Sequence, residues 1–213
     1  VTTDTFYVDM AVTNRTTYYY EITAIYDEGE SIPSNMAAAT PLAAASMPYF
    51  SDLEADDGGF FSMDDWQWGV PDFSDGPDTA FSLVNVWGTA LEGDYLAYAN
   101  EWLTQPFNLS GATGSVVLNF AAWAELESGW DYGIVAIDHD NDGLFTPLAE
   151  YTGNTGDWVQ EMIVVPDSLI SDYAILAFIL QSDGSGQRAG VYLDDISVMD
   201  VLLPELALTV EAD

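Results

Sequence analysis

The sequence predicts an all-β fold whose larger part is a sandwich of the jelly-roll kind. Short runs rich in β-branched and aromatic residues recur roughly every 10–15 residues, as in β-sandwiches. No stretch sustains the 3.6-residue apolar period of an amphipathic helix. Clusters of Gly, Asp, Asn and Pro, which favour turns, separate the runs. Because 49% of the 213 residues are hydrophobic, the chain can bury a substantial core.

The predicted strands are centred on the stretch from Gly129 to Gly143. Its β-branched and aromatic residues favour a half-buried strand over residues 132–137. The acidic run from Asp138 to Gly143 then ends this strand, because Asp, Asn and Gly adopt turn conformations readily. A second strand, residues 145–151, follows at hairpin distance. Further strands are expected at residues 95–99, 115–122, 158–165, 174–180 and 190–199.

The charge balance limits the classes of partner. The chain has 36 acidic residues, and its strong bases are Arg15 and Arg188, so the formal net charge is −34. Nucleic acids and anionic membrane surfaces need Lys and Arg to neutralise phosphate, so both are excluded as partners. Salt or divalent cations must relieve the self-repulsion. We interpret the acidity first as adaptation to a saline or calcium-rich medium, and second as a set of specific metal sites.

Compartment signals are sparse. The chain has no cysteine, so disulfides cannot stabilise it. No apolar run approaches the roughly 20 residues of a membrane span, and we expect no membrane insertion. No signal peptide is recognisable, and the chain starts inside a strand-like region. We therefore expect an excised or processed piece of a longer chain.

The first 42 residues carry their own strand pattern. Strands are expected over residues 5–9, 17–26 and 34–40, with a turn at 27–31. The run from Thr17 to Tyr26, followed by Gly29-Glu30-Ser31, Ser34-Asn35 and Ala39-Thr40-Pro41, resembles the C-terminal half of a fibronectin type III domain. The resemblance implies that the first three strands of that sandwich are missing. Such a half-sandwich has an open edge and an uncovered face, so something must cover it.

Residues 48–201 resemble a second family through an ordered set of motifs. The set comprises Trp66-Gln67-Trp68-Gly69, Trp87-Gly88-Thr89, Tyr95, Leu103-Thr104-Gln105-Pro106, Trp130-Asp131, Asp142-Gly143, Trp158 and Tyr192-Leu193-Asp194-Asp195-Ile196. The order is similar to the MAM-like jelly rolls of bacterial secreted proteins, including cleaved-adhesin domains and modules attached to secreted metallopeptidases. Two departures stand out. The disulfides of animal members are absent, and Phe145 stands where Trp is more usual.

Together the patterns predict four segments. Residues 1–42 are the C-terminal half of a fibronectin type III-like domain, 43–47 are a linker, 48–201 are the MAM-like jelly roll, and 202–213 are a linker or the first strand of a following domain. A strand-deficient sandwich at one end and an orphan strand at the other suggest head-to-tail pairing of chains. Arbitrary boundaries in a long multidomain protein are the simpler explanation, and both remain open.

A first candidate metal site is the acidic turn itself. Asp138, Asp140 and Asp142, followed by Gly143, match the start of a D-x-D-x-D-G calcium loop. The match then fails, because position 12 of the loop is Ala149 and its flanks are predicted strands. A polar hairpin turn is the competing interpretation.

The jelly-roll resemblance implies a second metal site. In that family an early acidic residue and the Asp before the last strand's Ile lie together and hold a structural calcium. The matching residues are Glu54 and Asp195, with Asp194 beside them, and nearby options are Asp56 and Asp57. Crowded carboxylates repel each other unless a cation compensates them. Asp131 is expected instead to accept hydrogen bonds from backbone amides beside Trp130.

Aromatic residues offer a ligand-binding alternative. Most of the seven Trp are expected in the core, because Trp contributes a large buried area. Trp66 and Trp68 lie on one face of an extended segment and are the best pair for stacking on a sugar.

Catalysis finds little support in the residues. A Ser-His-Asp arrangement would need His139, the chain's single His, which is expected to be a solvated turn residue. A single His without thiolates also argues against zinc. Paired carboxylates for glycoside hydrolysis remain open, since no spacing singles out a pair.

We therefore expect a non-enzymatic, calcium-stabilised module on a bacterial cell surface or in a secreted protein, in a saline medium. Its partners would be other chains or domains of the same surface assembly, and its role adhesion or assembly. The alternative is a carbohydrate-binding accessory module of a secreted hydrolase or peptidase.

Overall fold

The computed structural model describes residues 7–62 and 65–202 of the chain. It divides the chain into two compact units, Val1–Ala43 and Ala44–Asp213. The described residues form β-strands and one short 3₁₀ helix, Asp167–Leu169. None of the helical structure in the described ranges is long and apolar enough to cross a membrane. The all-β prediction is therefore confirmed.

The first unit consists of two short antiparallel pairs. Strand β1 (Tyr18–Tyr20) pairs with β4 (Ala37–Ala39), and β2 (Ile25–Tyr26) pairs with β3 (Gly29–Glu30). The single strand predicted over 17–26 is therefore wrong, because residues 21–24 separate β1 from β2. Residues 7–9 are not in a strand either, and the rest of that predicted strand lies partly outside the described residues. Many large apolar side chains of this unit face solvent, among them Tyr19, Ile22, Ile25, Tyr26 and Ile32.

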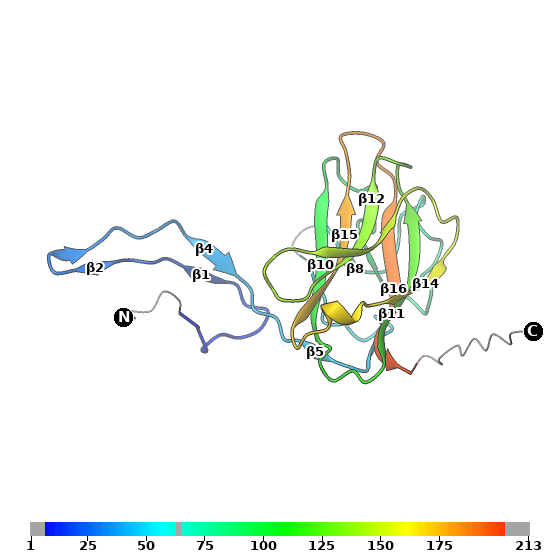
Figure 1. Ribbon diagram of the computed structural model, residues 1–213. Coiled ribbons are helices and arrows are strands. Elements are labelled where there is room, and N and C mark those ends of the chain that lie inside the picture. The colour runs from blue at the N-terminus through cyan, green and yellow to red at the C-terminus, as the bar shows by residue number, and fades with distance from the viewer. Residues whose placement is uncertain (1–6, 63–64, 203–213) are drawn as a thin grey trace, which may run out of the picture. The chain divides into compact units, whose positions relative to one another are not determined.

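The second unit is a sandwich of two sheets, one mixed through the parallel pairing of β5 with β10 and the other antiparallel (Figure 1). In one sheet the strand order is β13-β12-β15-β10-β5, and β7 also pairs with β10. In the other it is β14-β11-β16-β9-β8, and β6 also pairs with β16. The strands of the first sheet are β5 (Ala45–Ser46), β7 (Phe61–Ser62), β10 (Asn100–Asn108), β12 (Tyr132–Asp138), β13 (Thr146–Tyr151) and β15 (Ala174–Gln181). Those of the second are β6 (Tyr49–Ser51), β8 (Gln67–Gly69), β9 (Val86–Gly88), β11 (Ser115–Glu125), β14 (Val159–Val164) and β16 (Gly190–Val201).

The core lies between the two sheets. Phe178 of β15 faces Phe120 of β11 across the sandwich, with ring centroids 5.1 Å apart in an edge-on arrangement. Phe60 also packs on Phe178, with ring centroids 6.0 Å apart. All three rings are almost fully buried, which is where aromatic side chains contribute most to stability. The long strands β11, β15 and β16 thus supply the framework that positions the loops at both ends.

Two predicted strand assignments in this unit need correction. Residues 95–99 are not a strand, because Tyr98 has a φ of 58° and the chain turns there. The neighbouring strand is β10, Asn100–Asn108, which the prediction omitted although it pairs with β15 along eight residues from Asn100 to Phe107. The last predicted segment, 202–213, lies outside the described residues from 203 onward.

The sheet register brings distant loops together at each end of the sandwich. Tyr49 of β6 lies opposite Val198 of β16, so the segment after β6 reaches the middle of β16. Gln181, the last residue of β15, lies opposite both Asn100 and Tyr132. The loops before β10, before β12 and after β15 therefore share one end of the sandwich, the upper end in Figure 1.

Candidate functional site

Three acidic side chains from the first and last segments of the sandwich surround one loop. Glu54, Asp194 and Asp195, here called the closure carboxylates, all accept hydrogen bonds from residues 82–85. The backbone N–H of Ser82 donates to Asp194 Oδ2 at 2.8 Å, and the Ser82 hydroxyl donates to Asp195 Oδ1 at 2.9 Å. Glu54 Oε1 accepts from the backbone N–H groups of Val84 and Asn85, at 2.9 and 2.7 Å.

The closure carboxylates also repel one another. Asp194 is completely buried. Desolvation raises its pKa to about 6, and the neighbouring Asp195 and Glu54 add to this rise, although hydrogen bonds from Ser82 and Asp195 oppose it. A hard cation would favour the ionised form of Asp194, and carboxylate oxygens are the donors that such cations prefer. The chemistry of this donor set therefore fits calcium, although these three residues are not one of the described acidic groups that place one oxygen each within 4.8 Å of the others.

The nearby options of the sequence prediction have local roles. Asp56 Oδ1 accepts from the Gly58 N–H at 2.9 Å, and Asp57 Oδ1 accepts from the Gly59 N–H at 3.0 Å. Both bonds stabilise the turn that follows Glu54.

A second group, the turn carboxylates Asp138, Asp140 and Asp142, occupies the hairpin between β12 and β13. Each offers one oxygen within 4.8 Å of the others. Asp138 is buried and accepts from the backbone N–H groups of Asp142 and Gly143, at 3.3 and 2.9 Å. Asp140 and Asp142 are exposed, and Asp142 Oδ1 accepts from the Leu144 N–H at 2.8 Å. The turn is thus closed by its own backbone donors, as the polar-turn interpretation requires.

The turn lacks an acidic residue at the last position of a calcium loop. Glu150, the acid nearest position 12, is on β13 opposite Ile134, four residues before Asp138. His139 is partly exposed, and its Nδ1 lies 3.9 Å from Asp140 Oδ1. The turn therefore offers short carboxylates on a hairpin without the carboxylate that completes an EF-hand loop.

A third group was missed by the sequence prediction. Glu127, Asp131 and Asp183, the loop carboxylates, also place one oxygen each within 4.8 Å of the others. They come from the loops before β12 and after β15, which only the sheet register brings together. Asp131 Oδ1 accepts from the Asp183 N–H at 2.7 Å, and its Oδ2 accepts from the Tyr95 hydroxyl. No local motif connects residues 52 positions apart, so the sequence carried little signal for this group.

The predicted tryptophan pair is split between the core and the surface, which corrects the expectation that both rings form a platform. Trp66 is 4% exposed, and its indole N–H donates to the Glu101 carbonyl at 3.3 Å. Trp68 is 40% exposed, and its indole N–H donates to the Leu53 carbonyl at 2.8 Å. Trp66 lies just before β8, so the strand alternation that would place residues two apart on one face does not extend to it, and only Trp68 is exposed enough to meet a ligand.

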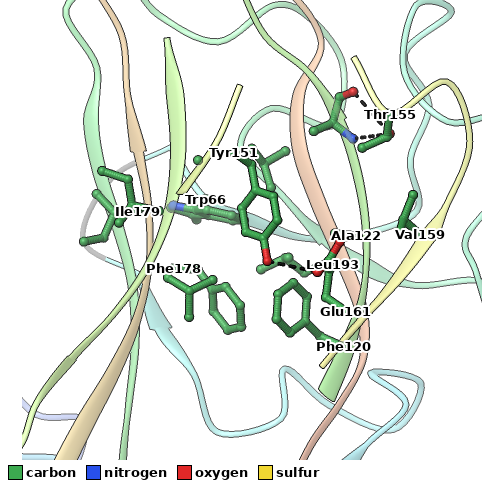
Figure 2. A pocket seen from close by; sticks show the side chains of 15 residues that line it. Trp66, Phe120, Ala122, Tyr151, Thr155, Val159, Glu161, Phe178, Ile179 and Leu193 are labelled. Carbon is green, nitrogen blue, oxygen red and sulfur yellow. Dashed lines mark hydrogen bonds between the residues drawn. The ribbon is translucent and has the colours of Figure 1, made fainter. Parts of the chain in front are cut away.

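Two hollows differ in size and chemistry. A cleft of about 40 Å³ opens between the edge strands β13 and β14 and is lined by apolar side chains, including Trp66 and Phe178 (Figure 2). At its mouth the Tyr151 hydroxyl donates to Glu161 Oε2 at 3.1 Å, and burial together with this carboxylate raises the pKa of Tyr151. A single water molecule needs about 10–15 Å³, so a cleft of about 40 Å³ is too small for a sugar. A hollow of about 400 Å³ is lined by polar residues that include Gln67, Glu92 and Asp94.

Comparisons with known proteins agree with this architecture. No family model matches the chain. The chain is 33% identical to Bacillopeptidase F of Bacillus subtilis (strain 168) over 175 residues, which are 81% of the chain and 12% of that protein. It therefore spans about one eighth of the length of this curated relative.

Similar solved structures include cleaved adhesin domains of Lys-gingipain. The K1 domain from Porphyromonas gingivalis W83 has a TM-score of 0.52 and 14% identity, covering 73% of this chain and 99% of that domain. The K2 domain has a TM-score of 0.48 and 16% identity, covering 72% and 98%. The likeness to the K1 domain supports the jelly-roll, adhesin-like fold. The MAM-like and fibronectin type III assignments stay predictions.

Proposed function

We propose that this chain is a non-catalytic, calcium-stabilised module for adhesion or assembly within a larger secreted or cell-surface protein. The observation that carries the proposal is the arrangement of the closure carboxylates. They belong to the first and last segments of the sandwich and hold one loop between them, so a cation bound among them would tie these segments together. Such a link suits an extracellular domain that has no disulfides.

The match covers 12% of Bacillopeptidase F, so the matched segment is a small part of that peptidase. This supports a place for the chain as one module within a long secreted protein. The adhesin-like fold supports a binding role. The first unit fits a role in assembly, since its exposed apolar side chains need a cover that the described strands do not provide.

We further propose the segment boundaries 1–42, 43–47, 48–201 and 202–213, with the first segment as the C-terminal half of a fibronectin type III-like sandwich. Its uncovered face would be completed by another chain or domain of the same assembly, including a head-to-tail neighbour. Light scattering coupled to size exclusion tests this pairing, and a strict monomer at high concentration would contradict it.

Melting experiments test the calcium proposal. Thermal unfolding is followed in EDTA, in calcium and in sodium chloride of matched ionic strength. Calcium at 100 times its dissociation constant should add about 2.7 kcal/mol to the free energy of unfolding. We expect Asp195→Ala to lose this increment, whereas Glu150→Ala, which removes an exposed acid from β13, should keep it.

Equal stabilisation by both salts would contradict the proposal. It would mean that the carboxylates act as a diffuse acidic shell and that calcium has no specific site among the closure carboxylates.

The second candidate is a carbohydrate-binding accessory module. It is favoured by the polar hollow of about 400 Å³, which is large enough for a sugar unit, and by the exposed ring of Trp68. Glycan-array binding and affinity electrophoresis on soluble polysaccharides test it. Loss of retention in Glu92→Gln or Trp68→Ala, but not in Glu150→Ala, would favour this candidate over adhesion to protein.

A further inference from the structure

We propose that the loop carboxylates, Glu127, Asp131 and Asp183, form a second divalent-cation site, separate from the closure carboxylates. This inference goes beyond the proposed function and does not depend on it. The first observation is geometric, because each residue places a carboxylate oxygen within 4.8 Å of the other two. Three negative charges at this spacing repel strongly in a partly buried site unless a cation lies between them.

A second observation points independently to a missing partner. Glu127 Oε2 is inaccessible to solvent and has no hydrogen-bond partner among the described residues. A buried carboxylate oxygen without a donor is costly, because it has lost its water and gained nothing in exchange. The Glu127 carboxylate packs so closely on the β15–β16 loop that Gly186, with a φ of 76°, has no room for a side chain. The oxygen is therefore held toward the loop that carries Asp183.

The other two ligands are firmly positioned. Asp131 is completely buried and is fixed by two donors, the Asp183 N–H on Oδ1 and the Tyr95 hydroxyl on Oδ2. Asp183 Oδ1 accepts from the Ser185 N–H at 2.8 Å. A carboxylate has about four lone-pair sites, so these bonds leave sites on both residues for a cation.

No described base compensates the three charges by an ion pair. Arg188 follows closely in the β15–β16 loop, but its Nη1 donates to the carbonyl of Gln187 at 2.9 Å. Within the described ranges it forms no ion pair with a carboxylate. The donor set contains only carboxylate oxygens, which identifies the class of ion as hard and divalent, with calcium preferred because flexible loops suit its variable coordination.

A cation at this site would connect three loops. Glu127 and Asp131 flank an exposed indole, Trp130, which is 64% exposed, and Asp183 comes from the opposite loop. Tyr95 joins the segment before β10 through its hydroxyl bond to Asp131. The ion would thus fix the position of the Trp130 ring at this end of the sandwich.

Terbium luminescence tests the site directly, because Tb³⁺ replaces Ca²⁺ and is sensitised by nearby Trp and Tyr rings. The full chain is titrated with TbCl₃, and the emission is then displaced with CaCl₂. We expect sensitised emission in the native chain and in Glu54→Gln, which leaves the loop carboxylates intact. Glu127→Gln and Asp183→Asn should weaken binding at least about tenfold, since even outer-shell changes at metal sites have effects of this size.

Glu125→Gln is the matched control, because it removes the same charge two residues before Glu127 and should bind like the native chain. Circular dichroism confirms that each variant is folded. Absence of sensitised emission in the native chain would overturn the site, as would equal emission in Glu127→Gln. Emission lost in Glu54→Gln and kept in Glu127→Gln would also overturn it, while leaving the proposed function intact.

Discussion

The closure carboxylates and the turn carboxylates each comprise three acids, but they satisfy their oxygens in different ways. The turn carboxylates are neighbours in sequence, and two of the three are exposed to water. The closure carboxylates come from segments about 140 residues apart in sequence, and Asp194 is fully buried among like charges. The turn carboxylates, which match a metal-binding sequence pattern, place one oxygen each within 4.8 Å of the others, whereas burial and like-charge crowding act on the closure carboxylates, so the sequence pattern and the electrostatics single out different groups.

The largest expected effect separates the two groups by stability. In calcium at about 100 times its dissociation constant, Asp194→Ala should lower the free energy of unfolding by about 4 kcal/mol, because it removes the bound ion and leaves the Ser82 N–H without its acceptor. Asp142→Ala removes only a turn bond to Leu144 and should cost about 0.5 kcal/mol. Urea unfolding followed by Trp fluorescence measures both. Similar losses in the two variants would remove the distinction.

A smaller effect is expected on the pH dependence of the free energy of unfolding in the absence of calcium. The pKa of Asp194 is raised to about 6 in the folded chain, above its ordinary value of 3.8. Between these values the folded chain keeps a proton that the unfolded chain releases, so this group makes stability fall as pH rises toward 6. The decrease should amount to about 3 kcal/mol, since one pKa unit corresponds to about 1.4 kcal/mol.

The measurement is the difference between the native chain and Asp194→Asn, melted in EDTA from pH 4 to 7. The difference isolates Asp194 from the other acids that titrate in this range. In calcium the same difference should shrink, because the ion favours the ionised carboxylate. An identical pH slope in the two proteins would refute the raised pKa.

The turn should depend on its backbone more than on a cation. Gly143 has a φ of 83° and open space around its Cα, so Gly143→Ala should cost about 1 kcal/mol through strain alone. Gly111→Ala, at an equally open position without a positive φ, is the control and should change stability by less than about 0.5 kcal/mol. The loss at Gly143 should be the same in calcium and in EDTA. A loss seen only in calcium would instead make the turn a cation site.

The smallest effect concerns the pair in the turn. His139 and Asp140 are partly exposed and 3.9 Å apart, so His139→Gln should change stability by no more than about 0.5 kcal/mol at pH 6. Adding sodium chloride should remove even this change, because salt screens exposed charges. Thermal melts at low and high salt measure it, and a salt-independent loss would assign His139 a structural role.

The strands from β11 to β16 could be predicted because their apolar runs are long and bounded by turn residues. The prediction failed beside them, at residues 95–99 and at β10. Pro106 lies inside β10, and a proline within an apolar run argues against a strand. Tyr95 and Ala99 have the spacing of strand residues, but they lie in a loop. Both side chains are buried there, and the Tyr95 hydroxyl donates a hydrogen bond to Asp131.

The candidate sites show the same limit. The resemblance selected Glu54 and Asp195, and the structure brings both to the loop that contains Ser82. Trp66 and Trp68 were paired because residues two apart in an extended segment share a face, but β8 begins only at Gln67, and Trp66, just before it, is buried in the core. The loop carboxylates could not be found from the sequence, since only the pairing of β12 with β15 makes neighbours of Asp131 and Asp183.

The pairing of β6 with β16 has a mechanical consequence. The two strands are antiparallel, and Tyr49, at the start of β6, lies opposite Val198, near where β16 ends. Tension applied through both flanking segments therefore pulls the strands apart like a zipper, so their hydrogen bonds break one after another rather than together. Once β6 has separated from β16 as far as Ser51, the force acts on Glu54. Glu54 is connected to Asp194 through the hydrogen bonds that both accept from the 82–85 loop, so these carboxylates resist further separation.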